Sequence, residues 1–254
     1  MGLGILGGGL SVAKWLYHQG ADLTITDLKT SSQLKSSLKL LKNKKIKYTL
    51  GRHLKSDFKD QDLIVQNPGV PRDSVYLDIA RRHKIPIVNE AVLFFQNYKY
   101  PKVGVTGTRG KSTTATLIHH ILKTKIKNHQ LAGNIATNPM LLAISKLKPN
   151  SWPVLELSSW HLELLADFKM SPTISVVTSI YPDHLNRYKN IKEYIRAKQI
   201  IARYQKKSDK LILNYDDKIV RQFAKLTQAQ VYYFSLKQKV NGAYLKNNFI
   251  YFKN

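Results

Sequence analysis

Short apolar runs alternate with amphipathic segments along most of the 254-residue chain, and glycine, proline or polar residues separate them. Apolar runs of this length predict strands, and the segments between them predict helices. We expect strands at 21–27, 63–66, 85–88, 103–106, 131–136, 153–157, 174–179 and 211–214, with strand-like tail segments at 243–245 and 249–252. We expect helices at 11–19, 74–83, from 111 to about 125, up to about 146, and at 191–204. Strands that alternate with helices are typical of an α/β fold in which helices flank parallel sheets.

The segment 98–101, Tyr-Lys-Tyr-Pro, interrupts this pattern and is typical of a connection between domains. A chain of this length can form two modest domains, each with its own core. We therefore expect one domain at residues 1–100 and a second at residues 101–254.

The most informative motif is 103–114, Val-Gly-Val-Thr-Gly-Thr-Arg-Gly-Lys-Ser-Thr-Thr. A strand, a glycine turn and a helix start follow one another here, which is the order that places backbone N–H groups around a polyphosphate. Gly107 and Gly110 allow a close backbone approach, Lys111 supplies a positive charge, and Ser112 offers a hydroxyl to Mg²⁺. The residues expected to bind ATP are Gly107, Thr108, Arg109, Gly110, Lys111, Ser112 and Thr113.

Val105 stands where the strict P-loop pattern G-x-x-x-x-G-K-[ST] has its first glycine, so the match is to the shorter form T-G-T-x-G-K-S-T. The alternative interpretation is an ordinary glycine turn before a basic helix. The order of strand, turn and helix favours a P-loop ATPase domain at 101–254.

A second glycine motif opens the chain. Residues 2–7, Gly-Leu-Gly-Ile-Leu-Gly, match G-x-G-x-x-G, and Asp27 follows about 20 residues later, as in nucleotide-binding βαβ units. This pattern predicts a Rossmann-like N-terminal domain. The fingerprint normally follows a strand, whereas only Met1 precedes it here, so we expect that the first strand is missing or that the true start lies upstream.

The sequence has 41 Lys and Arg against 16 Asp and Glu, which gives a formal net charge of +25. Such an excess attracts polyanions, so nucleic acid is a candidate partner. The lysines are spread along the chain, and within 31–47 they accompany Leu34, Leu38 and Leu41 at helical spacing, as on the solvated face of a helix. No cluster of aromatic residues accompanies them. We favour a lysine-rich surface without a specific nucleic-acid site; the alternative, a nucleic-acid-associated ATPase, predicts steeply salt-dependent binding.

The sequence contains no cysteine, which excludes disulfides and thiolate metal sites. No apolar run approaches the roughly 20 residues of a membrane span, and the first residues lack the pattern of a signal peptide. We expect a cytoplasmic protein with no membrane partner.

Six short motifs together resemble the Mur ligase family, the ATP-dependent amide-bond ligases of cell-wall precursor synthesis. They are Thr-Gly-Thr-Arg-Gly-Lys-Ser-Thr-Thr at 106–114, Gly-Asn-Ile at 133–135, Glu-Leu-Ser-Ser-Trp at 156–160, Tyr-Pro-Asp-His-Leu-Asn-Arg-Tyr at 181–188, Tyr-Ile-Arg-Ala-Lys at 194–198 and Asn-Tyr-Asp-Asp at 214–217. The glycine fingerprint and the turn Asn-Pro-Gly-Val-Pro at 67–71 most resemble the members that add D-glutamate to UDP-N-acetylmuramoyl-L-alanine. The members that add L-alanine are the nearest alternative.

The resemblance implies that ATP phosphorylates a substrate carboxylate and that the amine of D-glutamate attacks the resulting acyl phosphate. It implies catalytic roles for Lys111, His184 and Lys198. Ser112 and Glu156 would bind one Mg²⁺, and His184 with a carbamylated Lys198 would bind a second. From the residues alone, the alternatives are a paired structural carboxylate at Glu156, a structural histidine at His184 and a surface lysine at Lys198.

The resemblance also assigns substrate contacts. Asn134 and Ser159 would hold the muramoyl part, and Gly4, Gly7 and Asp27 lie in the region that would bind the uridine diphosphate. The expected cofactors are ATP and Mg²⁺, the expected small-molecule substrates are UDP-N-acetylmuramoyl-L-alanine and D-glutamate, and we expect a monomer.

The sequence departs from the family at two points. His161 stands where the family usually has glutamine. Family members also continue into a third domain that binds the incoming amino acid, whereas the sequence ends at Asn254. We therefore expect the first two domains only; the alternative is a binding module that holds ATP or a UDP-sugar without completing a reaction.

Overall fold

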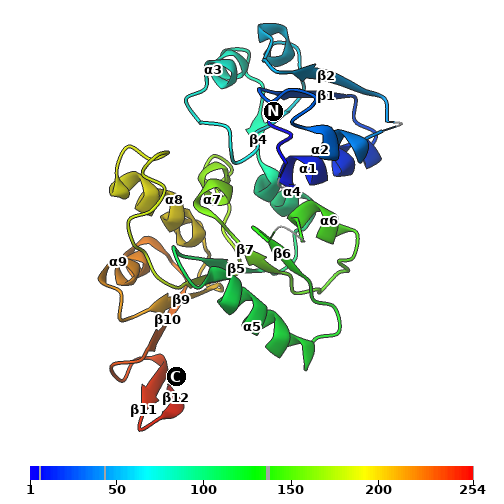
Figure 1. Cartoon of the computed structure of the whole chain (residues 1–254). Helices are drawn as coiled ribbons and strands as arrows, with labels where there is room; N and C mark the ends of the chain where they lie inside the picture. Colours follow the sequence, from blue (N-terminus) through cyan, green and yellow to red (C-terminus); the bar gives the residue numbers. More distant parts are fainter. Residues whose placement is uncertain (6, 43, 136–137, 254) are drawn as a thin grey trace. The chain divides into compact units, whose positions relative to one another are not determined.

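The computed structural model describes residues 1–5, 7–42, 44–135 and 138–253, which form two compact units (Figure 1). The first unit combines Met1–Tyr98 with Ile135–Ser145, and the second combines Lys99–Asn134 with Lys146–Asn254. Three positions used in the sequence interpretation lie outside the described residues: Leu6 of the fingerprint, Ala136 of an expected strand, and the terminal Asn254.

The first unit consists of short parallel strand pairs and helices. Its elements are α1 (Gly8–His18), β1 (Leu23–Asp27), α2 (Lys35–Lys39), β2 (Ile46–Leu50), the 3-10 helix η1 (Lys55–Phe58), β3 (Ile64–Val65), α3 (Val75–Arg82), β4 (Ile87–Val88), α4 (Glu90–Asn97) and α6 (Met140–Ile144). β1 pairs with β2 and β3 pairs with β4, both in parallel. One core gathers around Leu3, Leu34 and Leu41, and another around Phe58 and Leu77.

Met1 and Gly2 connect the two strand pairs of the first unit. The Met1 amine donates to the Val65 carbonyl at 2.9 Å, and the Gly2 N–H donates to the Thr26 carbonyl at 2.8 Å. These two residues therefore stand where the glycine fingerprint requires a preceding strand.

Helix α6 belongs to the first unit, although the boundary predicted at residue 100 assigns it to the second domain. Its residues Met140 and Leu141 are buried, and the Leu141 N–H donates to the Glu90 carboxylate at 3.1 Å. Ser11 of α1 donates to the same carboxylate at 3.2 Å. Burial raises the pKa of Glu90 to about 7. Burial of these apolar side chains and the hydrogen bond to Glu90 explain why α6 packs in the first unit. The residues on either side of this segment in the sequence belong to the second unit.

The second unit is built on one sheet with the strand order β12-β11-β10-β9-β8-β5-β7-β6. Its strands are β5 (Val103–Thr106), β6 (Leu131–Gly133), β7 (Val154–Glu156), β8 (Ile174–Val177), β9 (Lys210–Asn214), β10 (Gln230–Ser235), β11 (Gly242–Lys246) and β12 (Phe249–Lys253). All pairs are parallel except the β11–β12 hairpin, drawn in red in Figure 1.

Helices cover both faces of the sheet near β5. α5 (Lys111–Lys123) lies on one face, and α7 (Ser159–Leu165) and α8 (Ile191–Arg203) lie on the other (Figure 1). Val105, Val154 and Val176 form the core under α5. The short α9 (Lys218–Arg221) and η2 (Gln222–Leu226) follow β9. The expected α/β class with parallel sheets flanked by helices is confirmed.

The expected helix over 31–47 is largely wrong. α2 covers five residues, turns carry Leu34 and Leu41 into the core, and the last lysines of the run lie next to or within β2. Within the described residues, no helix is long and apolar enough to cross a membrane.

Candidate functional site

The glycine loop between β5 and α5 lies at the carboxyl end of the central strand. Gly107 has a φ of +152° and Gly110 a φ of +79°, which glycine adopts without strain. Thr178 at the end of β8 donates its hydroxyl to the Arg109 carbonyl at 2.6 Å, and the Thr108 N–H donates to the Ser179 carbonyl at 2.6 Å. Hydrogen bonds from the end of β8 therefore fix the conformation of the loop before the N-terminus of α5.

A buried carboxylate lies beside this loop. Glu156, at the end of β7, is 2% exposed. Its Oε2 accepts from the Ser112 hydroxyl at 2.7 Å, and its Oε1 accepts from the Asn134 amide at 3.1 Å. The parallel pairing of β7 with β5 and β6 brings these three side chains to one edge of the sheet. The structure thus joins the predicted ligands Ser112 and Glu156.

Two lysines occupy the same region. The Lys111 ammonium donates to the Thr108 carbonyl at 3.1 Å, and the Lys198 ammonium donates to the Gly107 carbonyl at 2.9 Å. Lys198 is 2% exposed, so it is not a surface lysine. Burial, and secondarily the charge of Lys111, lowers the pKa of Lys198 to about 7; burial also lowers the pKa of Lys111. A substantial fraction of Lys198 is therefore a neutral amine at neutral pH.

Aromatic rings connect Lys198 to His184. The Lys198 Nζ lies 4.8 Å from the centroid of the Tyr194 ring, and the Tyr194 hydroxyl is 3.0 Å from the Thr108 hydroxyl. His184 packs against Tyr194 and Trp160, with ring centroids 6.0 and 5.1 Å apart. Its φ of +53° places it in the left-handed region. His184 and Lys198 therefore both lie against the Tyr194 ring.

Asp183 adds negative charge beside these groups. Its carboxylate accepts from the His184 N–H at 2.9 Å, and the His184 Nε2 and Arg109 lie 3.8 and 3.9 Å from it. The charge of Asp183 also raises the pKa of Lys198, which offsets part of the lowering caused by burial.

Helix α7 begins immediately after the Glu156 strand. The Ser158 hydroxyl accepts from the His161 N–H, and the His161 ring accepts from the Ser158 N–H, so the two form a capping box. Burial lowers the pKa of His161 to about 4. Histidine thus fulfils the cap in place of the usual glutamine. Ser159, the first residue of the helix, is buried.

The predicted substrate residues of the first unit form a separate cluster. Gly4 and Gly7 have φ values of +62° and +90°, and Gly7 is the N-cap of α1. The Asp27 carboxylate accepts from the Gly4 N–H at 2.9 Å and from the Lys29 N–H at 2.8 Å. Asp27 therefore organises the fingerprint loop.

The donor set of the second unit fits a phosphate with Mg²⁺. Mg²⁺ is usually held by one or two protein oxygens together with substrate phosphates, and Ser112 and Glu156 supply such oxygens. In the part of the chain that the structure describes, no group of three or more His, Cys, Asp or Glu side chains gathers as a metal cage. The protonated Lys198 ammonium has no lone pair, so it can ligate a metal only after it loses a proton or is modified.

Sequence reasoning assigned no role to Tyr194, Asp183 or Thr178, although the first two lie inside the motifs quoted above. Thr178 carried a usable signal, since it follows β8 directly at the carboxyl end of the sheet. The contacts of Tyr194 depend on the packing of α8 and carried no such signal.

Two family models match the chain. The Mur ligase middle domain matches residues 105–254, and the MurD-like N-terminal domain of Mur ligases matches residues 1–89. UDP-N-acetylmuramoylalanine-D-glutamate ligase of Roseiflexus sp. (strain RS-1) is 41% identical over 230 residues, which cover 90% of this chain and 49% of the relative. The ligase of the same name from Acetivibrio thermocellus is 37% identical over 253 residues, covering 98% and 53%.

The chain spans about half the length of the curated relatives it matches. Among solved structures, UDP-N-acetylmuramate-alanine ligase from Thermotoga maritima is similar in fold, with a TM-score of 0.58 at 24% identity over 96% of this chain and 53% of that chain. Since the middle-domain model alone covers more than half of the sequence and includes the glycine loop, Glu156 and Lys198, this protein belongs to the Mur ligase family.

Proposed function

We propose that this chain forms the nucleotide-sugar-binding and ATP-binding domains of a ligase that adds D-glutamate to UDP-N-acetylmuramoyl-L-alanine. The observation that carries the proposal is its match, over nine-tenths of the chain or more, to relatives named for that activity. The contact between Ser112 and Glu156 beside a glycine loop supports the ATP-binding part.

The loop residues 107–113 would bind the phosphates of ATP. Backbone N–H groups at the start of α5 face the anion, and Lys111 would exchange its contact with the Thr108 carbonyl for a phosphate oxygen. Ser112 and Glu156 would hold Mg²⁺, which neutralises charge on the transferring phosphoryl group when it is bound.

In the proposed reaction, a carboxylate oxygen of the L-alanine residue attacks the γ-phosphorus, and the bond to ADP breaks. The amine of D-glutamate then attacks the acyl carbon, loses a proton, and phosphate leaves. Positive charge from Lys111 stabilises the phosphoryl transfer. Arg109, Thr108 and Thr113 complete the loop around the nucleotide.

Lys198 and His184 would serve the acyl end of the reaction. The neutral amine of Lys198 can add CO₂ and release a proton, which gives a carbamate with oxygen ligands, and His184 offers a ring nitrogen. The lowered pKa and the burial of Lys198 support its part in this assignment. Asn134 and Ser159 would contact the muramoyl part, and Gly4, Gly7 and Asp27 the uridine diphosphate.

The test measures ADP release with UDP-N-acetylmuramoyl-L-alanine and a panel of amino acids. Two proteins are compared: this chain, and this chain joined to the C-terminal domain of a full-length relative. We expect release that depends on D-glutamate in the joined protein. Release with UDP-N-acetylmuramate and L-alanine would identify the alternative ligase. Nucleotide binding without turnover in either protein would favour the binding module. The monomeric state and the cytoplasmic location stay predictions.

A further inference from the structure

Two histidine rings face each other near the carboxyl-terminal end of α5. The Nε2 of His119 lies 2.8 Å from the Nδ1 of His129, the ring centroids are 4.5 Å apart, and the ring planes are inclined by 75°. His119 lies about 12 Å along the helix axis from Lys111, at the rise per residue of an α-helix. Neither ring therefore belongs to the proposed ATP site.

The fold holds each of the two rings from a different side. α5, which carries His119, packs onto the core of the second unit. His129 lies in the segment 124–130, which returns from α5 to β6. On either side of His129, the carbonyl of residue 128 accepts from the Trp152 N–H at 3.0 Å, and the carbonyl of residue 130 accepts from the Val154 N–H at 2.8 Å. The rings are therefore held together by the surrounding backbone and not only by their own contact.

The contact also shows that ring lone pairs are available. A hydrogen bond between two ring nitrogens joins one N–H to one lone pair, so at least one of the two rings is neutral. The ordinary histidine ring is neutral above a pH of about 6.5. If the donor ring moves its proton to its other nitrogen, both facing nitrogens present lone pairs. This change of tautomer neither adds nor releases a proton.

The separation of the two nitrogens indicates which metal would fit. Metal–imidazole bonds are about 2.0–2.1 Å long. At that length, neighbouring nitrogens lie about 2.9 Å apart in a square plane and about 3.4 Å apart in a tetrahedron. The observed 2.8 Å is close to the square-planar value. Square-planar sites of nitrogen and oxygen ligands favour Cu²⁺ and Ni²⁺, and Cu²⁺ binds more tightly than Ni²⁺.

The surroundings allow a metal to enter but limit its affinity. Both rings are half-buried, so water can reach the site and complete the coordination. Burial, and then the charges of His129, Lys123 and His120, lowers the pKa of His119. The positive charge of Lys123 would also repel a bound cation. Removal of this charge should therefore strengthen metal binding.

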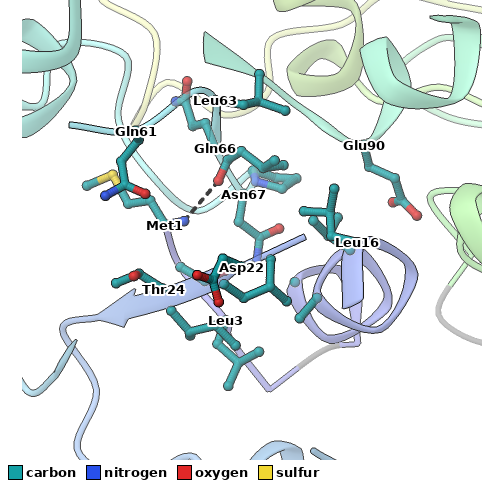
Figure 2. Close-up of a pocket in the computed structure, with 18 residues that line it drawn as sticks. Met1, Leu3, Leu16, Asp22, Thr24, Gln61, Leu63, Gln66, Asn67 and Glu90 are labelled. Atoms are coloured by element: carbon teal, nitrogen blue, oxygen red, sulfur yellow. Dashed lines mark hydrogen bonds between the residues drawn. The ribbon is translucent and has the colours of Figure 1, made fainter. Parts of the chain in front are cut away.

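A cavity of about 110 Å³ in the first unit does not offer such a site (Figure 2). No histidine is among the described residues that line it. Figure 2 shows its two carboxylates, Asp22 and Glu90, apart from each other. Glu90 already accepts hydrogen bonds from Ser11 and Leu141. The histidine pair therefore suits a metal that prefers imidazole better than this cavity does.

We propose that His119 and His129 form a two-histidine site for a divalent transition metal of square-planar geometry, with Cu²⁺ preferred over Ni²⁺. Water occupies the remaining positions. Two protein ligands hold a metal less firmly than the three or four of a resident site, so the ion is exchangeable. A bound ion would join the end of α5 to the segment that precedes β6.

The test titrates the whole chain with Cu²⁺ and with Ni²⁺ in a calorimeter at about pH 7.5, where the ordinary histidine ring is neutral. His119→Gln and His129→Gln each remove one ligand. We expect each to weaken Cu²⁺ binding by at least about tenfold, since even outer-shell partners of metal ligands are worth about 10- to 100-fold. Lys123→Gln should tighten binding.

His120→Gln is the matched control, because it removes the same kind of side chain from the next position of α5, about 100° around the helix. It should not weaken Cu²⁺ binding. An excess of Mg²⁺ should also leave Cu²⁺ binding unchanged, because Mg²⁺ selects oxygen ligands and would occupy the proposed ATP site instead. Electron paramagnetic resonance of bound Cu²⁺ should show two imidazole nitrogens in the unaltered chain and fewer in each ligand variant.

Cu²⁺ binding of equal strength in the unaltered chain and in both ligand variants would overturn the proposal, because the ion would then be held elsewhere. A loss in His120→Gln as large as that in His119→Gln would overturn it too. Circular dichroism of the metal-free proteins shows whether each variant is folded. If one ligand variant does not fold, the other one decides.

Discussion

Glu156 is a buried carboxylate whose two oxygens have different partners. Ser112 and Asn134 each donate to one oxygen, so two hydrogen bonds fix the carboxylate at the edge of the glycine loop. We predict that Glu156→Gln lowers the affinity for ATP in the presence of Mg²⁺ by at least about tenfold and removes the benefit of Mg²⁺. Calorimetric titration with and without Mg²⁺ measures both effects.

Glu163 offers a matched control in the same unit, because it is also buried and accepts hydrogen bonds from Tyr188 and Arg187. Glu163→Gln should leave the Mg²⁺ dependence of ATP binding unchanged. An equal loss of Mg²⁺-dependent ATP binding in the two variants would point to general destabilisation and would contradict the proposed metal-binding role of Glu156.

His161 carries a prediction about acid stability. Its pKa is about 4 in the folded protein because the ring is buried, whereas the ordinary value is 6.5. Between these values the unfolded chain binds more protons, so the free energy of unfolding falls as the pH drops from 6.5 to 4. The loss for this group is about 3 kcal/mol. His161→Gln keeps a capping side chain but cannot titrate, so its stability should fall less over that range. Urea unfolding at several pH values tests this, and identical pH profiles would contradict it.

At the residue scale, the family resemblance paired Ser112 with Glu156, and the structure brings these two side chains into contact. Their meeting is understandable because the strand ends of a parallel sheet lie at one edge, whereas their metal-binding role stays a prediction. The placement of both His184 and Lys198 against the Tyr194 ring depends on how α8 packs, and it was not predictable. The capping role of His161 was recognisable only in part, because histidine is not a usual residue of a capping box.

The loop between β5 and α5 shows how an element restricts its residues. A Cβ on Gly107 would lie 1.9 Å from the Thr178 hydroxyl, which itself donates to the Arg109 carbonyl. A Cβ on Gly110 would meet Thr178 at 3.8 Å, in ordinary contact. We predict that Gly107→Ala costs at least about 2 kcal/mol of stability through overpacking. Gly110→Ala should cost about 1 kcal/mol through its left-handed backbone alone.

Urea unfolding of both variants beside the unaltered chain measures this difference. Gly110→Ala acts as the control for backbone strain, because it changes φ preference without a steric clash. Equal losses of stability in the two variants would show that the predicted clash with Thr178 adds nothing to the cost of a side chain at Gly107.

At the element scale, strands with strong apolar runs were predicted within a few residues. β2, β10 and α4 were not predicted, although α4 carries a start signal in its N-cap Asn89, whose side chain accepts from the Val92 N–H. The assignment of α6 was missed because the carboxylate that holds it, Glu90, comes from a distant part of the sequence. Such errors arise where tertiary contacts outweigh local propensity.

For the whole molecule, the net charge of +25 has two interpretations. It belongs either to a nucleic-acid-associated ATPase or to a ligase with a lysine-rich surface. A dedicated nucleic-acid protein would bind through an organised groove, whereas a lysine-rich surface attracts any polyanion through long-range charge alone. Both interpretations give steeply salt-dependent DNA binding, because both neutralise phosphates; we predict that binding to a mixed-sequence duplex weakens by about a thousandfold between roughly 50 and 200 mM salt, and that it shows no sequence preference. ATP binding with Mg²⁺ should change far less, because the proposed loop site would contact the phosphates at short range in a partly buried place.

Fluorescence anisotropy with a labelled duplex and calorimetry with ATP, on the same preparation, measure the two salt dependences. A duplex of different sequence serves as the control and should give the same curve. DNA binding that survives at high salt with a sequence preference, or ATP hydrolysis that DNA stimulates, would contradict the ligase assignment. The comparison is decisive because both ligands are polyanions: if the glycine loop is the specific site, only ATP gains from the backbone N–H groups of α5 and the oxygens of Ser112 and Glu156.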